Sequence, residues 1–229
     1  MSYALVTANR NYSSWSLRPW LLMTALGIPF EDRVVRFVGA DNWASFRAFS
    51  PTGQVPVLIH GERTVWDSLG IALYLAERHD GVWPADEGPR GWAQCAVAEM
   101  HGGFNALRNE RPMNVGVRIT PIGRSAALAR NVERLGELWG EGLERFGGPW
   151  LAGAALGAVD AFFAPVAFRV RTYGIELPAL AAAYVDRLLA HPAMQAWEQV
   201  ALAETWRDDD HEAELAGVGT ITQDLRAQG

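Results

Sequence analysis

The sequence predicts an α/β module followed by an all-α module, and three observations support this prediction. Short apolar runs alternate with helical patterns in the first 80 residues, whereas only helical periodicity remains after residue 91. The segment GVWPADEGPRG at 81–91 is rich in glycine and proline, as linkers are. The charge also changes there, because the first 80 residues hold 7 arginines and 7 acids and the remainder holds 13 arginines and 19 acids. We therefore predict domains at 1–80 and 92–229, joined by a linker at 81–91.

The first module is predicted to follow the order βαβαββα. Its first apolar run is typical of a buried strand, and Gly27 closes the helix that follows. Gly61 and Glu62 turn the third strand into a hairpin, and Asp67 with Ser68 marks the start of the last helix. The predicted ranges are strands at 3–8, 31–37, 55–60 and 64–66, and helices at 19–26, 41–49 and 67–79.

The second module is predicted to be all-α, with no strand. Helical periodicity separated by proline or glycine covers 92–107, 124–146, 158–173, 179–189 and 194–204. Residues 207–229 are charged and aperiodic, so we expect them to lie loosely on the surface or to fray. Cys95 falls inside the first of these helical patterns, and we expect an inert buried thiol there.

Composition excludes several classes of site. All 20 basic residues are arginine, so a Schiff-base lysine, a pyridoxal-phosphate anchor and a Walker-type phosphate loop are ruled out. The formal net charge of −6 argues against nucleic-acid binding. A single cysteine permits no intramolecular disulfide, CxxC redox pair or cysteine zinc cluster, and the five histidines lack the spacing of metal ligands. We therefore expect no metal site.

The sequence also predicts a cytoplasmic, non-membrane protein. The N-terminus has no basic region followed by a long apolar stretch, and Asp160 interrupts the longest apolar run, at 150–159. The single cysteine fits a reducing compartment.

A run of hydroxyl side chains stands between the first strand and the first helix. Ser13, Ser14 and Ser16 precede a helix that begins near Leu17, where unpaired backbone N–H groups and the helix dipole favour an anion. A single serine at such a place is more often a helix N-cap than an anion-binding residue.

Two further segments carry candidate ligand-binding residues. Pro56 begins a strand, so it marks a bulge, an edge or a cis bond that leaves the backbone of Val55 free to pair with an extended peptide. A plain edge-strand proline explains it as well. Asp67 can accept from an ammonium group, and Ser68 stands where a helix N-terminus would bind a carboxylate. Both residues are also ordinary caps.

The order and spacing of these segments resemble the cytosolic glutathione transferases over nearly the whole chain. Four stretches carry the resemblance: SSWSLRPWLLMTALG at 13–27, PTGQVPVL at 51–58, DSLGIALYLAE at 67–77 and LAGAALGAVDAFFAPV at 151–166. The SSWS run and the segment Gln54-Val55-Pro56 are most similar to the SSCS and QVP runs of the zeta class. The resemblance implies an N-terminal thioredoxin-like domain, an all-helical C-terminal domain and a homodimer.

The resemblance also implies roles for these residues. Ser13 would donate to the glutathione sulfur, with Ser14 and Ser16 as alternatives, and a hydroxyl donor at a helix N-terminus would stabilise a thiolate. Gln54, Val55 and cis-Pro56 would hold the cysteinyl backbone, and Asp67 with Ser68 the γ-glutamyl end. Trp15, Met113 and Asn114, the last two within the segment 107–115, would contact a small hydrophobic electrophile. Glutathione would be the cosubstrate, and no metal would be required.

Two positions depart from the family pattern. Gly157 stands where the family usually has a Ser or Thr cap, three residues before Asp160. Zeta-class isomerases carry an arginine twelve residues past that aspartate, whereas this chain has Thr172. The resemblance therefore implies conjugation of glutathione to an electrophile. Its alternatives are peroxide chemistry with glutathione, cis–trans isomerisation of the maleylacetoacetate or maleylpyruvate type, and glutathione binding without turnover.

Overall fold

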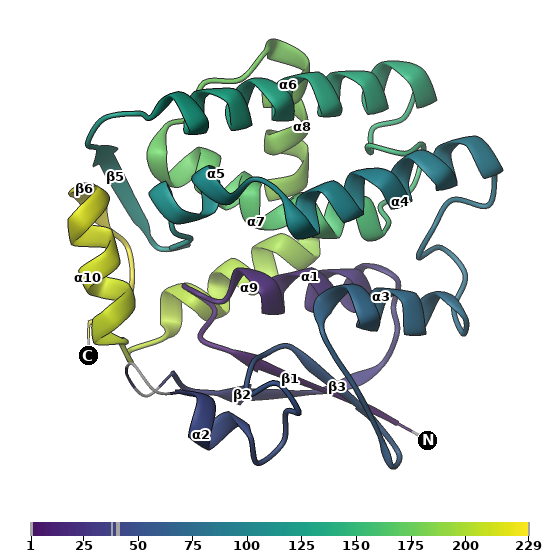
Figure 1. The fold of residues 1–229 in the computed structure, drawn as a ribbon, viewed down its shortest axis with the longest axis horizontal. Coiled ribbons are helices and arrows are strands. Elements are labelled where there is room, and N and C mark those ends of the chain that lie inside the picture. Colours follow the sequence, from purple (N-terminus) through teal and green to yellow (C-terminus); the bar gives the residue numbers. More distant parts are fainter. Residues whose placement is uncertain (1, 38, 40–41, 229) are drawn as a thin grey trace.

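A four-stranded sheet forms one layer of the molecule and a helical domain forms the other (Figure 1). The computed structural model of the chain describes residues 2–37, 39 and 42–228. The strand order is β2-β1-β3-β4, with β1 parallel to β2 and antiparallel to β3. The elements of this layer are β1 (Tyr3–Ala8), α1 (Ser14–Ala25), β2 (Phe30–Val35), α2 (Asn42–Phe46), β3 (Val57–His60), β4 (Arg63–Val65) and α3 (Ser68–Ala76). The predicted order βαβαββα is confirmed.

Helix α1 begins five residues before its predicted start at Pro19. It starts at Ser14 and runs through Pro19, which forgoes one backbone hydrogen bond inside the helix. Burial of its apolar face offsets that loss, because Leu17, Leu21 and Leu22 are fully buried. Ser14, Trp15 and Ser16 therefore lie in the first turn of α1. Asp41, the predicted start of α2, lies outside the described residues.

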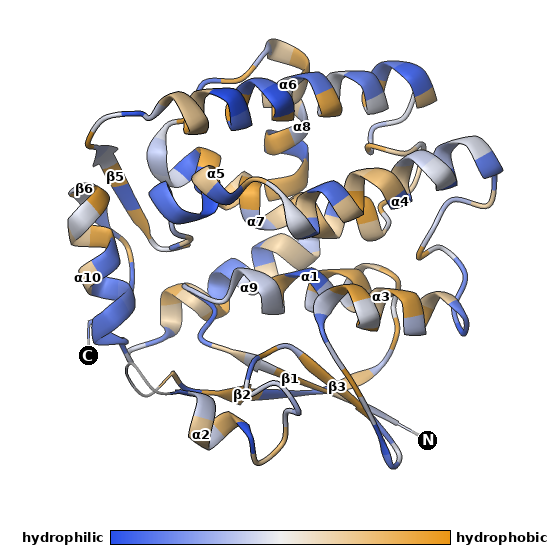
Figure 2. Cartoon of the chain, in the orientation of Figure 1, coloured by the Kyte–Doolittle hydropathy of each residue, from blue (hydrophilic) through white to orange (hydrophobic). Residues whose placement is uncertain are grey.

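The second layer is built around a buried central helix. Figure 2 shows α7 (Ala158–Tyr173) coloured largely hydrophobic, and nearly all of its residues are buried. It packs against α1, which joins the two layers in one core. The other helices of this layer are α4 (Glu87–Gly102), α5 (Asn105–Glu110), α6 (Ala126–Phe146), α8 (Ala179–Leu189) and α9 (Pro192–Ala203).

The C-terminal segment differs from the expectation of a loose tail. Residues 209–218 form α10 (Asp209–Val218), and β6 (Gly219–Asp224) pairs antiparallel with β5 (Val117–Pro121). The prediction that the second module has no strand is therefore wrong, although the module is mainly helical. Local patterns could not show this pairing because the two strands lie about 100 residues apart in sequence, and each is paired only with the other in the described part of the chain.

Two further differences concern α4. Cys95 is exposed, so the expectation of a buried thiol is wrong. The buried face of α4 is formed by Ala93, Ala96, Val97 and Met100, a helical stripe that omits position 95. The predicted helix over 92–107 is divided between α4 and α5, because Phe104 adopts a left-handed conformation with φ 56°. Within the described residues, we find no helix with both the length and the apolar character that a membrane span needs.

Candidate functional site

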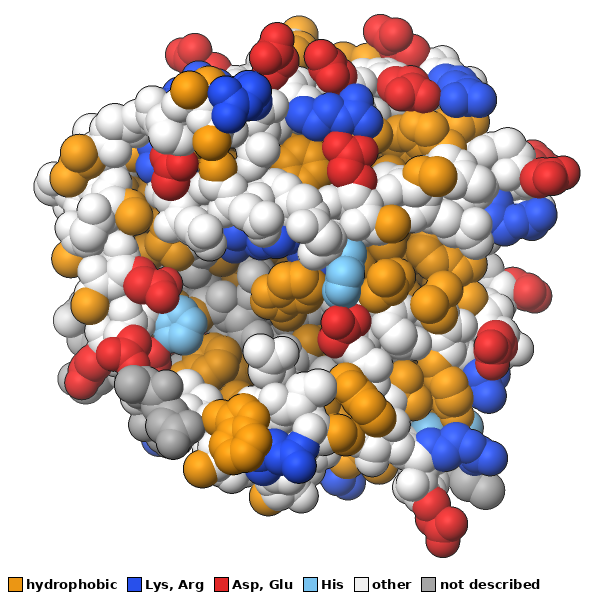
Figure 3. Space-filling model, in the orientation of Figure 1, with side chains coloured by type: hydrophobic (Ala, Val, Ile, Leu, Met, Phe, Trp, Pro, Cys, Tyr) orange, Lys and Arg blue, Asp and Glu red, His pale blue; other side chains and the backbone are white. Residues whose placement is uncertain are grey.

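A cleft of about 450 Å³ opens between the two layers, beside the N-terminus of α1. Its volume is in the range of small-molecule sites. Figure 3 shows the face onto which it opens, with hydrophobic and histidine side chains around a hollow. The lining residues are Tyr12, Ser13, Ser14, Trp15, Phe37, Thr52, Gln54, Val55, Pro56, Asp67, Arg108, Asn109, Pro112, Met113, Arg169, His211 and Glu214.

Ser13 lines the cleft at the N-cap position of α1, but its side chain makes no capping hydrogen bond. Its hydroxyl instead donates to Oγ of Ser16 at 2.7 Å. A hydroxyl that is not used for capping can turn towards a ligand at the helix N-terminus, where the dipole favours negative charge.

The other two serines differ in their positions. Ser14 also lines the cleft. Ser16 lies beneath it, fully buried, and its Oγ accepts from the backbone N–H of Ala8 at 3.2 Å. Ser16 therefore supports Ser13 from behind and is not among the residues that line the cleft.

Gln54, Val55 and Pro56 line the side of the cleft next to the sheet. The Val55–Pro56 peptide bond is cis. Strand β3 starts only at Val57, so the backbone of Val55 lies outside the strand ladder.

Asp67 caps helix α3 and also lines the cleft. It is the N-cap of α3, and its Oδ1 accepts from the backbone N–H of Leu69 at 2.9 Å. It also lines the cleft, where its Oδ2 lies 3.3 Å from Nε2 of His101 on α4. Burial lowers the pKa of His101, and Asp67 acts in the opposite direction.

Ser68 lies behind Asp67 at the first position of α3 and is not among the residues that line the cleft. It is fully buried, and its hydroxyl has no hydrogen-bond partner in the described part of the chain. A buried hydroxyl without a partner at a helix N-terminus is suited to a bound anion.

The helical side of the cleft brings together Trp15 and Met113. Asn114 does not line the cleft. It is fully buried, its backbone carbonyl accepts from the hydroxyl of Thr172, and its Oδ1 accepts from the N–H of Gly116. Its neighbours Arg108, Asn109 and Pro112 do line the cleft, so the segment 107–115 contributes through other residues than Asn114.

Arginines surround Trp15 on this side. Arg18 lies 4.0 Å and Arg108 5.4 Å from the centroid of its ring. Arg169, from α7, is buried and donates from Nε and Nη1 to backbone carbonyls of Arg111 and Pro165. Burial lowers the pKa of Arg169 to about 10 and that of Arg18 to about 9. Arg108 and Arg169 therefore bring positive charge to this part of the cleft lining, which also contains Glu214.

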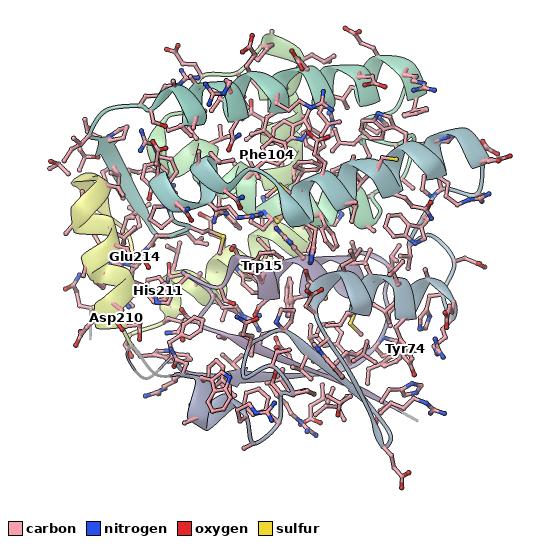
Figure 4. The ribbon with its side chains drawn as sticks, viewed as in Figure 1. Trp15, Tyr74, Phe104, Asp210, His211 and Glu214 are labelled. Carbon is pink, nitrogen blue, oxygen red and sulfur yellow. The ribbon has the colours of Figure 1, made fainter. Side chains whose placement is uncertain are left out.

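Sequence reasoning missed the contribution of the C-terminal segment. His211 and Glu214 line the cleft from α10, and Figure 4 shows both on the side of that helix turned towards Trp15. Tyr12 also lines it, and its ring stacks on His211 with 4.8 Å between centroids. The charged, aperiodic sequence at 207–229 gave no signal for this placement, whereas Tyr12 could have been found from its position beside Ser13.

The titratable residues of the cleft do not form a metal centre. Among the described residues, no group of three or more His, Cys, Asp or Glu side chains is arranged to hold a metal ion.

Comparison with known proteins finds similarity in sequence and in fold. Residues 12–78 match the family model described as glutathione S-transferase, N-terminal domain. Dichloromethane dehalogenase of Methylorubrum extorquens is 44% identical over 62 residues, which are 26% of this chain and 22% of that protein. The chain spans only about a fifth of the length of the Methylorubrum dehalogenase and of the dichloromethane dehalogenase of Methylophilus leisingeri.

Other relatives match over a larger part of the chain. Glutathione S-transferase 1 of Dianthus caryophyllus is 24% identical over 170 residues, which cover 72% of this chain and 77% of that protein. A crystal structure of a glutathione transferase homologue from Burkholderia, with bound glutathione, has a TM-score of 0.65 at 23% identity and covers 87% of this chain and 97% of that one. The matched N-terminal domain contains the serine loop, the Val55–Pro56 segment and the start of α3, and the fold agrees beyond it. Residues 12–78 are thus similar to the N-terminal domain of glutathione S-transferases, and the fold of most of the chain is similar to that of a glutathione transferase homologue.

Proposed function

We propose that this protein is a glutathione transferase that binds glutathione along the sheet side of the cleft and activates its thiol for attack on a small electrophile. The observation that carries the proposal is the Ser13 hydroxyl, which lines the cleft at the N-terminus of α1 without capping that helix. Val55 and Asp67, the N-cap of α3, line the same cleft. These are the places where an extended tripeptide would need backbone and charge contacts.

Ser13 would stabilise the thiolate. A free thiol has a pKa of about 8.5 and is mostly protonated at neutral pH. A donated hydrogen bond and the dipole of α1 lower that pKa, so the sulfur is poised as a nucleophile. When the Ser13 hydroxyl turns to the sulfur, the Ser16 hydroxyl, 2.7 Å away, can donate to Ser13 in turn. The thiolate then forms a bond to the electrophilic carbon, and the leaving group departs with the electron pair of the bond that breaks.

The γ-glutamyl end of glutathione would lie at the start of α3. The Ser68 hydroxyl, buried and without a partner, would donate to its carboxylate, and Asp67 would accept from its ammonium group. Val55 would pair through its backbone with the cysteinyl residue, because its N–H and carbonyl groups lie outside the strand ladder. Gln54 lies beside it on the cleft wall.

Ser68→Ala and Asp67→Asn are expected to weaken glutathione binding about tenfold or more, because hydrogen bonds to charged groups contribute about 1.5–3 kcal/mol. Calorimetric titration of glutathione into the folded variants measures this effect. The thermal midpoint of each variant is the control. If both variants keep the wild-type affinity, Asp67 acts only as the N-cap of α3, Ser68 does not contact the ligand, and the glutathione site must be moved from the start of α3.

The electrophile would occupy the side formed by Trp15 and Met113. This wall combines an aromatic face with the guanidinium groups of Arg108 and Arg169, so a substrate with both an apolar body and a negative group would fit it. These arginines favour a second candidate function, glutathione-dependent cis–trans isomerisation of a maleyl substrate, although Thr172 is buried at the position where such isomerases carry arginine.

Turnover measurements separate these functions. We would assay an aryl halide, an organic hydroperoxide and a maleyl substrate with glutathione, beside glutathione binding measured alone. Conjugation of the aryl halide supports the transferase, and turnover of only the maleyl substrate supports the isomerase. Binding without any turnover would assign the chain to non-enzymatic glutathione-binding proteins.

The family resemblance also leads us to propose a homodimer, because closed two-fold pairing is the commonest assembly of soluble proteins. Trp66, which follows β4, and Leu73, in α3, are 44% and 50% exposed. Their side chains would be available for contacts between two copies of the chain. Sedimentation at micromolar concentration is expected to give twice the chain mass of 25.1 kDa. A mass equal to that of one chain would contradict the dimer.

A further inference from the structure

The loop that carries Ser13 is fixed by the far end of the chain. Asn11 illustrates this: its Nδ2 donates to the carbonyl of Ala201 at 2.6 Å, and its Oδ1 accepts from the N–H of Gly116 at 3.1 Å. The carbonyl of Arg10 accepts from the indole N–H of Trp197 at 3.0 Å. Each of these bonds joins the N-terminal layer to the helical layer.

Glu204, at the end of α9, binds the same loop through its carboxylate. Its Oε1 accepts from the backbone N–H of Arg10 at 2.7 Å, and its Oε2 accepts from the backbone N–H of Asn11 at 3.3 Å. Glu204 is only 5% exposed, and burial raises its pKa. A buried carboxylate that accepts from two successive backbone N–H groups fixes the direction of the chain at Arg10 and Asn11, directly before Tyr12 and Ser13.

Tyr12 extends this attachment to α10. Its hydroxyl donates to Oε1 of Glu212 at 2.6 Å. Glu212 is held in turn by Arg226, whose Nη2 donates to Oε2 at 3.0 Å. Arg226 is 5% exposed and also pairs with Asp224 at the end of β6. The phenol is therefore held by a carboxylate that the β5–β6 ribbon and α10 together keep in place.

The approach of Arg226 to the loop is close. A Cβ atom built on Gly116 would lie 2.3 Å from Cγ of Arg226 and 3.1 Å from Oδ1 of Asn11. Glycine at position 116 is therefore required for the C-terminal segment to pack against the serine loop. In Figure 1, α10 stands beside both layers of the molecule, which is consistent with this bridging position.

We propose that Tyr12 and Glu212 are positioning residues for Ser13, and that the segment 204–226 thereby sets the pKa of the bound glutathione thiol. This inference rests on the proposed function. Tyr12 precedes Ser13 directly, and the N–H groups of both donate to the carbonyl of Asn9, so the two residues belong to one turn. A donor stabilises an anion only within a narrow range of distance and direction, and a shift of about 1 Å is enough to lose much of its effect.

The test is the pH titration of the ultraviolet absorbance of enzyme-bound thiolate. Tyr12→Phe removes only the hydroxyl. Glu212→Ala removes the carboxylate that accepts from this hydroxyl, and Glu212 does not line the cleft. Each is expected to raise the pKa of bound glutathione by about one unit, a tenfold change in the thiolate equilibrium. The rate at pH below that pKa should fall about tenfold and recover at higher pH, while affinity for glutathione stays within about threefold. The matched control is Asp210→Asn on the exposed side of α10, which should leave the thiol pKa unchanged.

The double variant Tyr12→Phe/Glu212→Ala distinguishes positioning from direct contact. Both changes break the Tyr12–Glu212 hydrogen bond, and Glu212→Ala also removes a partner of Arg226. The double variant should therefore have the thiol pKa of Glu212→Ala alone and not the sum of the two shifts. A shift in Tyr12→Phe alone would mean that the phenol contacts the sulfur, and would overturn the inference, as would an unchanged pKa in both single variants. If the wild-type protein does not lower the thiol pKa at all, the proposed function itself fails.

Discussion

Ser13→Ala is expected to lower the glutathione-dependent rate by about 10²-fold, because removal of one preorganised donor to a developing or bound anion has effects of this size. The affinity for glutathione should change far less, since the tripeptide would keep its contacts at Val55, Asp67 and Ser68. Steady-state rates with an aryl halide, together with calorimetric titration of glutathione, separate the two quantities.

Serine variants nearby serve as controls for this prediction. Ser14→Ala should have a small effect on the rate. Ser14 lines the cleft, but it lies inside α1 and not at the N-cap position that Ser13 occupies. Ser16→Ala should have an intermediate effect, since it removes the group that Ser13 contacts from behind. An unchanged rate in Ser13→Ala contradicts the assignment, and a large loss only in Ser14→Ala moves the donor to that residue.

Asp160→Ala is expected to lower the free energy of unfolding by about 3 kcal/mol or more, because each buried donor left without a partner costs about 1–3 kcal/mol. The Asp160 carboxylate accepts from the N–H groups of Leu151 and Gly157 and from the Tyr184 hydroxyl, each at 3.0 Å. It thus closes the N-terminus of α7, whose residues form the centre of the core. Denaturant unfolding at neutral pH measures the loss.

The same residue predicts a dependence of stability on pH. Burial raises the pKa of Asp160 to about 6, above the value of about 3.9 for an unfolded aspartate. The folded protein therefore binds the proton more tightly than the unfolded chain. The resulting stabilisation is complete below pH about 4 and is lost as the pH rises through about 6. Asp160→Asn should abolish this part of the pH profile; a profile identical to wild type would show that Asp160 does not titrate in this range.

Much of the fold could be predicted from local sequence. The predicted bounds of the strand at Tyr3–Ala8 and of α7 and α8 agree with the structure. Each of these elements is a strong apolar pattern with a clear end in the sequence. The start of α1 could not be placed in this way. Pro19 is a local signal against helix, and only packing of Leu17, Leu21 and Leu22 in the core makes the helix continue through it.

Local sequence also predicted some residues of the candidate site correctly as lining the cleft and others wrongly. Ser13, Val55 and Asp67 could be singled out because each stands where a strand or loop meets the next element, and such junctions carry ligand contacts. Ser16 and Ser68 stand at such junctions, and Asn114 was chosen from the family resemblance. The side chains of all three are buried and do not line the cleft, because the direction of a side chain depends on the packing around it.

By itself, the sequence determined the order of the two layers and the hydroxyl loop at the head of α1, since these depend on local periodicity and turn chemistry. The predicted linker at 81–91 stays a prediction, and its last five residues belong to α4. Only the tertiary structure decided that Arg169 and His211 meet at the cleft, and that Glu212, 200 residues away in sequence, holds Tyr12. Contacts of this kind arise when separate elements bury their apolar faces against one another, and no local pattern encodes which polar side chains that packing brings together.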